Sequence, residues 1–201
     1  GQAKHLQNKP DLILTEIEIF CKENNLIILD DFKASHIRAQ IRLQDPEVVV
    51  QFGTHSGYSP ILVANELCKI NGPKTMSKVF TFEIDPIFAE ISAQIIELSG
   101  LQDIIVPIFG KSGNCIKRFA EEHLIERIDL LLLDHWPDCY LPDLRVVETM
   151  SLITKGTVIF ADNIAQKMSA ADYLDYVRSP PVYKREYDTR IKNVNGSHYI
   201  G

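Results

Sequence analysis

Two acidic residues and one amide stand directly after apolar segments of this chain. Four consecutive leucines, Leu130–Leu133, lead into Asp134. The segment Thr157–Ala161 leads in the same way into Asp162 and Asn163. Such runs are typical of buried parallel strands, and open α/β sheets bind ligands at the carboxyl ends of their strands. Because Mg²⁺ prefers one or two carboxylates together with other oxygen ligands, we predict a magnesium site at the two aspartates and the asparagine.

The same three residues also permit a purely structural interpretation. Asp162 and Asn163 would then cap the segment that follows them, and Asp134 would make a buried hydrogen bond. Each residue alone fits this alternative, whereas three oxygen-bearing side chains at adjacent strand ends favour a cation site. The sequence has no cluster of histidine and cysteine with the spacing of a zinc site.

A glycine-containing turn follows the first predicted strand, where a nucleotide-like ligand meets such a sheet. Gly53 and Gly57 allow close approach of the backbone, and the helix that follows offers free N–H groups. Their spacing is neither that of a dinucleotide fingerprint nor that of a Walker sequence. Glu83 ends the second strand, where an acid commonly binds ribose hydroxyls, and Ser112 follows the third strand. Together these features favour an adenosine ligand, whereas the glycines alone would equally serve a tight turn.

His135 and Trp136 follow Asp134 directly. A lone histidine or tryptophan usually packs against its neighbours, and this interpretation stays open. Beside a ligand cleft the two side chains would instead cover an adenine ring by stacking and hydrogen bonding.

Strand and helix patterns alternate along the chain without a repeat or a long linker. The predicted strands are Val48–Phe52, Lys78–Ile84, Ile104–Phe109, Ile128–Leu133, Thr157–Ala161, Val182–Tyr187 and Lys192–Ile200. The predicted helices are Pro10–Asn25, Asp31–Leu43, Ile61–Leu67, Pro86–Leu98, Ile116–Leu124, Pro142–Ile153 and Ala170–Val177. We predict one α/β domain over residues 1–201, with helices in 1–45 and a sheet core in 46–201. The sheet is Rossmann-like, doubly wound and mostly parallel, with an antiparallel C-terminal edge.

Composition and charge restrict the class of partner. The chain is 45% hydrophobic and 24% charged, as in ordinary soluble proteins, and its net charge of −6 disfavours nucleic acid and anionic membranes. No apolar stretch approaches the ~18 residues that span a bilayer, and no secretory signal begins the sequence. The four cysteines are well separated, which indicates reduced thiols. We therefore expect a cytoplasmic protein whose partner is neither nucleic acid nor a membrane.

Short motifs between about Asp31 and the C-terminus connect this chain to a known family. The motifs are FGTHSGYS at Phe52–Ser59, EIDP at Glu83–Pro86, GLQD at Gly100–Asp103, DHW at Asp134–Trp136, YLPD at Tyr140–Asp143, KGTV at Lys155–Val158 and ADN at Ala161–Asn163. With them the chain resembles the catechol O-methyltransferase family, whose members depend on S-adenosylmethionine and Mg²⁺. The resemblance implies a seven-stranded sheet with an antiparallel last strand.

The resemblance also implies a role for each matched residue. The methionine part of the cofactor would contact Gly53, His55 and Ser59. The ribose hydroxyls would bind Glu83, with Ile84 also at the cofactor. The adenine would be surrounded by Ser112, Gly113, His135 and Trp136. Mg²⁺ would bind Asp134, Asp162 and Asn163 together with both substrate hydroxyls, and Asp134 would also face the cofactor and take part in catalysis.

Four positions depart from the family pattern. The lysine that serves as general base in the family is Pro137 here, and the acid at the end of the first strand is Gln51. The tryptophan that gates the catechol would fall near Asn25. The glutamate that steadies the catechol would fall near Asp188 or Thr189. Substrate-handling motifs are therefore less well kept than the cofactor and metal motifs.

The resemblance and the three metal-binding residues together predict methylation of a catechol-like diol. In this reaction Mg²⁺ would lower the pKa of a hydroxyl and orient both oxygens. Asp138 or Lys167 would take the proton in place of the missing lysine. The substrate would be enclosed by Ile27, Leu29, Trp136 and residues 165–169, and the family resemblance implies a monomer.

Three alternatives remain open at this point. The first is a methyltransferase-like protein that binds the cofactor without turnover, which Pro137 favours. The second is O-methylation of another diol or phenol. The third is a nicotinamide-dependent reductase, which the glycine spacing opposes.

Overall fold

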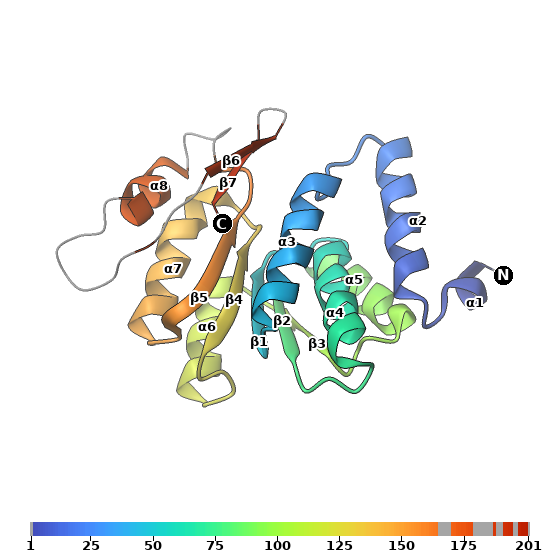
Figure 1. The fold of residues 1–201 in the computed structure, drawn as a ribbon, viewed down its shortest axis with the longest axis horizontal. Helices are drawn as coiled ribbons and strands as arrows, with labels where there is room; N and C mark the ends of the chain where they lie inside the picture. The colour runs from blue at the N-terminus through green and yellow to red at the C-terminus, as the bar shows by residue number, and fades with distance from the viewer. Residues whose placement is uncertain (1, 165–169, 179–186, 188–190, 195–196, 201) are drawn as a thin grey trace.

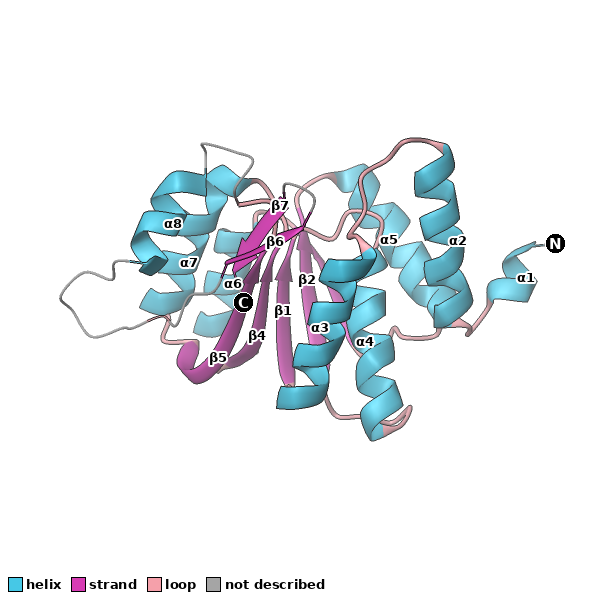
Figure 2. Cartoon of the chain, turned by 45° about the horizontal axis from the view of Figure 1, so that its top comes forward, coloured by secondary structure: helices cyan, strands magenta, loops and turns pink. Residues whose placement is uncertain are grey.

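A parallel β-sheet forms the centre of the molecule. The computed structural model describes the chain except residues 1, 165–169, 179–186, 188–190, 195–196 and 201. Five parallel strands lie side by side (Figure 2): β1 (Val48–Phe52), β2 (Lys78–Glu83), β3 (Ile105–Phe109), β4 (Ile128–Leu133) and β5 (Ile153–Ala161). The described strands β6 (Ile191–Val194) and β7 (Ser197–Ile200) follow β5, which gives the order β3-β2-β1-β4-β5-β7-β6. The predicted α/β class with a Rossmann-like parallel sheet is confirmed.

Helices cover both faces of this sheet (Figure 1). One face carries α2 (Pro10–Glu23), α3 (Asp31–Gln44), α4 (Tyr58–Asn71) and α5 (Pro86–Ser99), and the short α1 (Gln2–Leu6) contacts α2 and α5. The other face carries α6 (Ser112–Glu121), α7 (Tyr140–Thr149) and α8 (Ala171–Arg178). Among the helices described, none combines the length and the apolar character needed to cross a membrane.

The four leucines of β4 are buried because both faces of the strand are covered. Leu130 and Leu132 belong to the hydrophobic core under α2–α5, whereas Leu131 and Leu133 belong to the core under α6–α8. Alternate side chains of a strand point to opposite faces, so a strand covered on both sides buries all of them. Full burial of one such side chain contributes about 1.5–3 kcal/mol, which fixes the register of β4 and hence the place where it ends.

Strand β5 begins earlier than the sequence pattern predicts. The predicted helix Pro142–Ile153 is wrong at its end, because α7 stops at Thr149 and Ile153 already pairs with Ile128. Ser151 has a φ of 59°, which interrupts the helical backbone. Gly156 has a φ of 103°, and the register of the β4–β5 pair shifts between Ile128 and Leu130. An irregular pairing of this kind breaks the alternation of apolar and polar residues, so the first half of the strand was not predicted from the sequence.

The C-terminal segment also differs from the prediction. Lys192–Ile200 is not one strand, because β6 and β7 pair antiparallel with Val194 opposite Ser197. The sequence between them is Asn-Gly, a common two-residue hairpin signal that the prediction overlooked. Strand β7 pairs antiparallel with β5 through Ala161 and Ile200. Of the predicted strand Val182–Tyr187, residues 182–186 lie outside the described part of the chain.

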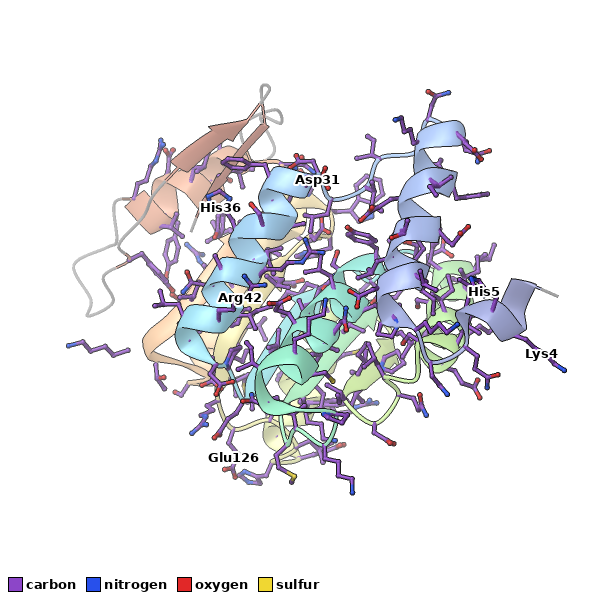
Figure 3. The ribbon with its side chains drawn as sticks, turned by 45° about the vertical axis from the view of Figure 1, so that its right-hand side comes forward. Lys4, His5, Asp31, His36, Arg42 and Glu126 are labelled. Atoms are coloured by element: carbon purple, nitrogen blue, oxygen red, sulfur yellow. The ribbon has the colours of Figure 1, made fainter. Side chains whose placement is uncertain are left out.

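Helix α3 has its N-terminal turn near the carboxyl ends of the strands. Asp30 caps its N-terminus, since the Asp30 carboxylate accepts a hydrogen bond of 2.8 Å from the backbone N–H of Lys33. Asp31, His36 and Arg42 lie along this helix (Figure 3). Its buried side chains include Ala34, Ile37 and Ile41, which hold α3 against α4 and the sheet. This packing fixes the position of the first helical turn over the carboxyl ends of the strands.

Candidate functional site

Asp134 and Asp162 lie at the ends of two paired strands. Leu133 pairs with Ala161, and the backbone N–H of Asp162 donates to the carbonyl of Leu133 at 3.0 Å. The backbone N–H of Asp134 in turn donates to the carbonyl of Phe52 on β1 at 2.9 Å. Both aspartates line one pocket, together with Leu29, Ile37, Gln51, Ser59, Leu132, Leu133 and Phe160. The sheet register therefore places the two carboxylates side by side.

Asn163 completes the set of oxygen ligands predicted from the sequence. Its backbone N–H donates to Asp162 Oδ1 at 2.7 Å, and its side-chain Nδ2 lies 3.3 Å from Asp162 Oδ2. Asn163 has a φ of 53°, a left-handed conformation that few residues other than glycine adopt and that is concentrated at functional sites. The hydroxyl of Tyr140 donates to the carbonyl of Asp162 at 3.0 Å and so anchors the strand end from the opposite face. The structure brings Asp162 and Asn163 together through direct hydrogen bonds.

A residue that the sequence analysis did not identify also reaches this site. The ammonium group of Lys33, from the first turn of α3, lies 2.6 Å from Asp162 Oδ1 and 3.1 Å from Asn163 Oδ1. Its side chain is only 6% exposed, and so is that of Asp162. A lysine in the first turn of a helix is a weak signal in a sequence, because most such residues lie on the surface. The oxygens of this site therefore hold a positive charge.

The electrostatics of the site reflect two adjacent negative charges. Solvent reaches Asp134, but the protein atoms packed around its carboxylate desolvate it, and this raises its pKa above the ordinary value. The charge of Asp162 raises the pKa of Asp134 further, and Lys33 lowers it. Desolvation, followed by the charges of Asp134 and Asp162, also raises the pKa of the Tyr140 hydroxyl, which stays protonated as a donor. The positive charge of Lys33 therefore offsets part of the repulsion between the two carboxylates.

The chemistry of these donors fits a hard cation. Over the described residues, no three or more His, Cys, Asp or Glu side chains group in a way that would hold a metal ion. A metal at this place would therefore rely on two carboxylates and an amide oxygen, which is a magnesium-type set rather than a zinc-type set. The Lys33 ammonium already occupies two of these oxygens and acts as a stand-in ion. The residues present thus fit a cation.

Glu83 fixes the backbone of the turn between β1 and α4. One carboxylate oxygen of Glu83 accepts hydrogen bonds from the backbone N–H groups of Thr54, at 3.0 Å, and His55, at 2.8 Å. The other oxygen accepts from Asp85 N at 3.0 Å. Gly53 has a φ of 91°, and a Cβ there would lie 2.4 Å from the Asp134 carbonyl oxygen. The turn therefore fits closely against β4, with Glu83 directed at its backbone.

His55 and Ser59 continue this turn toward the pocket. His55 has a φ of 49°, is exposed, and its ring lies 4.2 Å from that of Phe88. Ser59 lies in the first turn of α4 and lines the pocket that holds both aspartates. Ile84 follows Glu83 and is 47% exposed. Gln51 is fully buried, and its Nε2 donates to the carbonyl of Gly53 at 2.6 Å.

Two of the residues expected around an adenine, His135 and Gly113, lie beside Asp143. His135 Nε2 lies 3.0 Å from Asp143 Oδ2, and a Cβ at Gly113 would lie 2.4 Å from Asp143 Oδ1. Ser112 is buried at the first position of α6, four residues before the predicted start of that helix at Ile116. That prediction was wrong because Ser112, Gly113 and Asn114 carry no apolar signal. Trp136 is 70% exposed and so stands at the surface rather than in the core.

The predicted proton acceptors lie apart from the cluster or beyond the described residues. Asp138 is exposed on the short 3₁₀ helix η1 (Pro137–Cys139) and is not one of the described residues that line the pocket. Pro137 is buried at the start of the same helix. Lys167, residues 165–169 as a group, Asp188 and Thr189 lie outside the described residues. Of the predicted substrate wall, Leu29 lines the pocket and Ile27 is 88% exposed.

Comparison with known proteins identifies the family of this chain. Residues 50–164 match a family described as a methyltransferase domain. Catechol O-methyltransferase from Sus scrofa is 32% identical over 146 residues, which cover 73% of this chain and 75% of the relative. The chain belongs to the catechol O-methyltransferase family. Catechol O-methyltransferase B from Danio rerio is 34% identical over 179 residues, or 89% of this chain, and the chain spans 65% of that relative.

Solved structures share the fold of this family member. An O-methyltransferase from Bacillus cereus, solved in complex with SAH, superposes with a TM-score of 0.74 over 94% of this chain and 89% of that chain. The two sequences are 18% identical, so the likeness concerns the fold.

The close contact at Gly53 leads to a test of the site geometry. Gly53→Ala adds a methyl group against the Asp134 carbonyl at a positive φ, and Gly72→Ala is a matched control, because Gly72 has a φ of 83° with no atom within 4 Å of its Cβ. Both variants carry backbone strain of about 1–3 kcal/mol. We expect Gly53→Ala to lower the free energy of unfolding in urea by about 1–3 kcal/mol more than the control, since only it is overpacked. Equal losses in the two variants would contradict the described turn.

Proposed function

We propose that this chain is an S-adenosylmethionine-dependent O-methyltransferase that acts on a catechol-like small molecule with the assistance of Mg²⁺. The observation that carries the proposal is the group formed by Asp134, Asp162 and Asn163 at the carboxyl edge of a methyltransferase sheet, in which Asp162 and Asn163 hold the ammonium group of Lys33. Family membership and the fold of an SAH-bound neighbour support the cofactor.

Cofactor binding would use the turn after β1 and the beginning of α6. Gly53, His55 and Ser59 would contact the methionine part, and Glu83, with Ile84 beside it, would hold the ribose. Ser112, Gly113, His135 and Trp136 would surround the adenine. The fixed orientation of Glu83, the contact of His135 with Asp143, and the lack of room for a side chain at Gly113 beside the same carboxylate support these roles. When bound, the cofactor supplies an electrophilic methyl group.

Metal binding would use Asp134, Asp162 and Asn163. Bound there, Mg²⁺ supplies Lewis acidity that lowers the pKa of a catechol hydroxyl. The chain itself orients the three ligands: Asn163 N–H holds Asp162 Oδ1, Tyr140 holds the Asp162 carbonyl, and the β1 pairing holds Asp134. Such prior orientation reduces the entropy lost when the substrate is placed for in-line attack.

Proton removal is where this chain would differ from its relatives. Pro137 stands at the position of the family's lysine, and a buried proline takes no proton. Asp138 and Lys167 are the proposed acceptors, and Asp138 is placed for solvent exchange by its exposure. General-base assistance is worth about 10²–10⁴-fold, so its loss slows the reaction without abolishing it.

The remaining parts of the proposal concern the molecule as a whole. Residues 1–201 would form one domain with a seven-stranded sheet and an antiparallel last strand. It would act as a cytoplasmic monomer on a small molecule. Leu29, which lines the pocket, and the exposed Ile27 would form part of an apolar wall of the kind that a catechol ring requires.

The activity is tested with purified protein, labelled S-adenosylmethionine, Mg²⁺ and a panel of catechols and related phenols. We expect methyl transfer to at least one vicinal diol, with no transfer to the matching monophenols, since the metal requires two neighbouring oxygens. Transfer to monophenols alone would contradict the role of the metal.

A cofactor-binding protein without turnover is a second candidate, and the buried Pro137 favours it. Calorimetry distinguishes it from the enzyme. Binding of S-adenosylmethionine without methyl transfer to any member of the panel would establish this candidate and contradict the enzyme.

The metal ligands are tested separately with Asp162→Asn. This variant keeps the shape of the side chain and removes its charge, so we expect the Mg²⁺ dependence to disappear and the rate to fall about a hundredfold or more. Asp103→Asn is the control, because Asp103 is exposed in the turn before β3, at the opposite edge of the sheet. An Asp162→Asn variant with wild-type rates and metal dependence would show that the metal binds elsewhere.

A further inference from the structure

Lys33 has a buried ammonium group that contacts two of the three proposed metal ligands. Its Nζ is 2.6 Å from Asp162 Oδ1 and 3.1 Å from Asn163 Oδ1, and its side chain is 6% exposed. A buried lysine is stable only when it is paired and hydrogen-bonded, and these two oxygens supply that pairing. The ammonium therefore holds positions that a divalent cation at this site also requires.

The place of Lys33 on its helix supports a role tied to the site. Lys33 is the third residue of α3, in the first turn. The N-terminal end of a helix carries partial positive charge, so a lysine is disfavoured there, whereas acids are favoured. The capping carboxylate of Asp30 is 3.9 Å from Lys33 Nζ, farther than Asp162. The acids at the strand ends, rather than the helix, thus account for the position of this charge.

The ligand oxygens are oriented by contacts other than Lys33. Asp162 Oδ1 accepts from Asn163 N at 2.7 Å, and Asp162 Oδ2 lies 3.3 Å from Asn163 Nδ2. The Asp162 carbonyl accepts from Tyr140 at 3.0 Å. Loss of the ammonium therefore removes a positive charge from the site while these contacts still hold the oxygens.

We infer that Lys33 is an internal counter-cation that neutralises Asp162 in the metal-free protein and competes with divalent cations for Asp162 and Asn163. The inference rests on the proposed function, because it uses the same metal ligands. A divalent cation and an ammonium group repel each other when they share ligand atoms, so the ammonium must leave when the metal binds. Metal affinity is then lower than the three oxygen ligands alone would give, and metal binding moves the side chain at the start of α3.

Calorimetric titration of the full chain with Mn²⁺, without cofactor or substrate, tests the competition. Lys33→Met removes the charge, and Lys33→Gln removes the charge but keeps a hydrogen-bond donor for Asp162. We expect both variants to bind Mn²⁺ at least tenfold more tightly than the wild type. Lys69→Met is the matched control, because Lys69 pairs with Asp11 on the exposed surface, and its affinity for Mn²⁺ should equal that of the wild type.

Thermal unfolding supplies a second readout that does not depend on activity. Without metal, Lys33→Met should unfold at a lower temperature than the wild type, since two neighbouring carboxylates lose their cation. Saturating Mn²⁺ should close this gap, because a ligand that binds only the folded protein stabilises it. A purely structural lysine would leave the gap unchanged. If Lys33→Met does not fold, Lys33→Gln decides the outcome.

The results separate this inference from the proposed function. Suppose that the wild type binds Mn²⁺, that Asp162→Asn does not, and that the Lys33 variants bind it no more tightly than the wild type. This result would overturn the counter-cation role and leave the metal site standing. Absence of Mn²⁺ binding in the wild type and in Lys33→Gln alike would overturn both. Binding by Lys33→Gln alone would support the inference, with the ammonium as the barrier to the metal.

Discussion

The repulsion between Asp134 and Asp162 is the constraint on which the site depends. Their strands pair in parallel at Leu133 and Ala161, so the next residue of each strand must lie beside the other. Two like charges ~5 Å apart, the spacing of neighbouring strands, repel by about 3 kcal/mol at an effective dielectric constant of about 20. Lys33 offsets part of this cost, because its ammonium group pairs with Asp162 and its charge lowers the pKa of Asp134.

The end of β4 also fixes the glycine turn after β1, where the cofactor is proposed to bind. The Asp134 carbonyl faces Gly53, and the Asp134 N–H binds Phe52, so β4 and the glycine turn are fixed to each other at one residue. Glu83 then fixes the other side of the turn through Thr54 and His55. A shift of β4 by one residue against β5 would separate the carboxylates, and packing on both faces of β4 opposes such a shift.

Much of this arrangement could be predicted because it follows from strand periodicity. The leucines of β4 determine where Asp134 appears, and a positive φ at Gly53 follows from its role in the turn. Lys33 could not be predicted, because its contact joins α3 to a strand end 130 positions away and nothing local marks it. The early start of β5 was missed because its pairing is irregular near Gly156, and the β6–β7 hairpin because its Asn-Gly signal was not weighed. The proposed roles of Asp138 and Lys167 in taking the proton depend on the substrate, which strand patterns do not encode.

Crystallography of the protein soaked with Mn²⁺, with the ion located by anomalous scattering, tests the central claim most directly. The account predicts one ion bound by oxygens of Asp134, Asp162 and Asn163, with Lys33 Nζ withdrawn from both of its present partners. An ion located elsewhere, or no ion at the strand ends while Lys33 keeps its contacts, would contradict it.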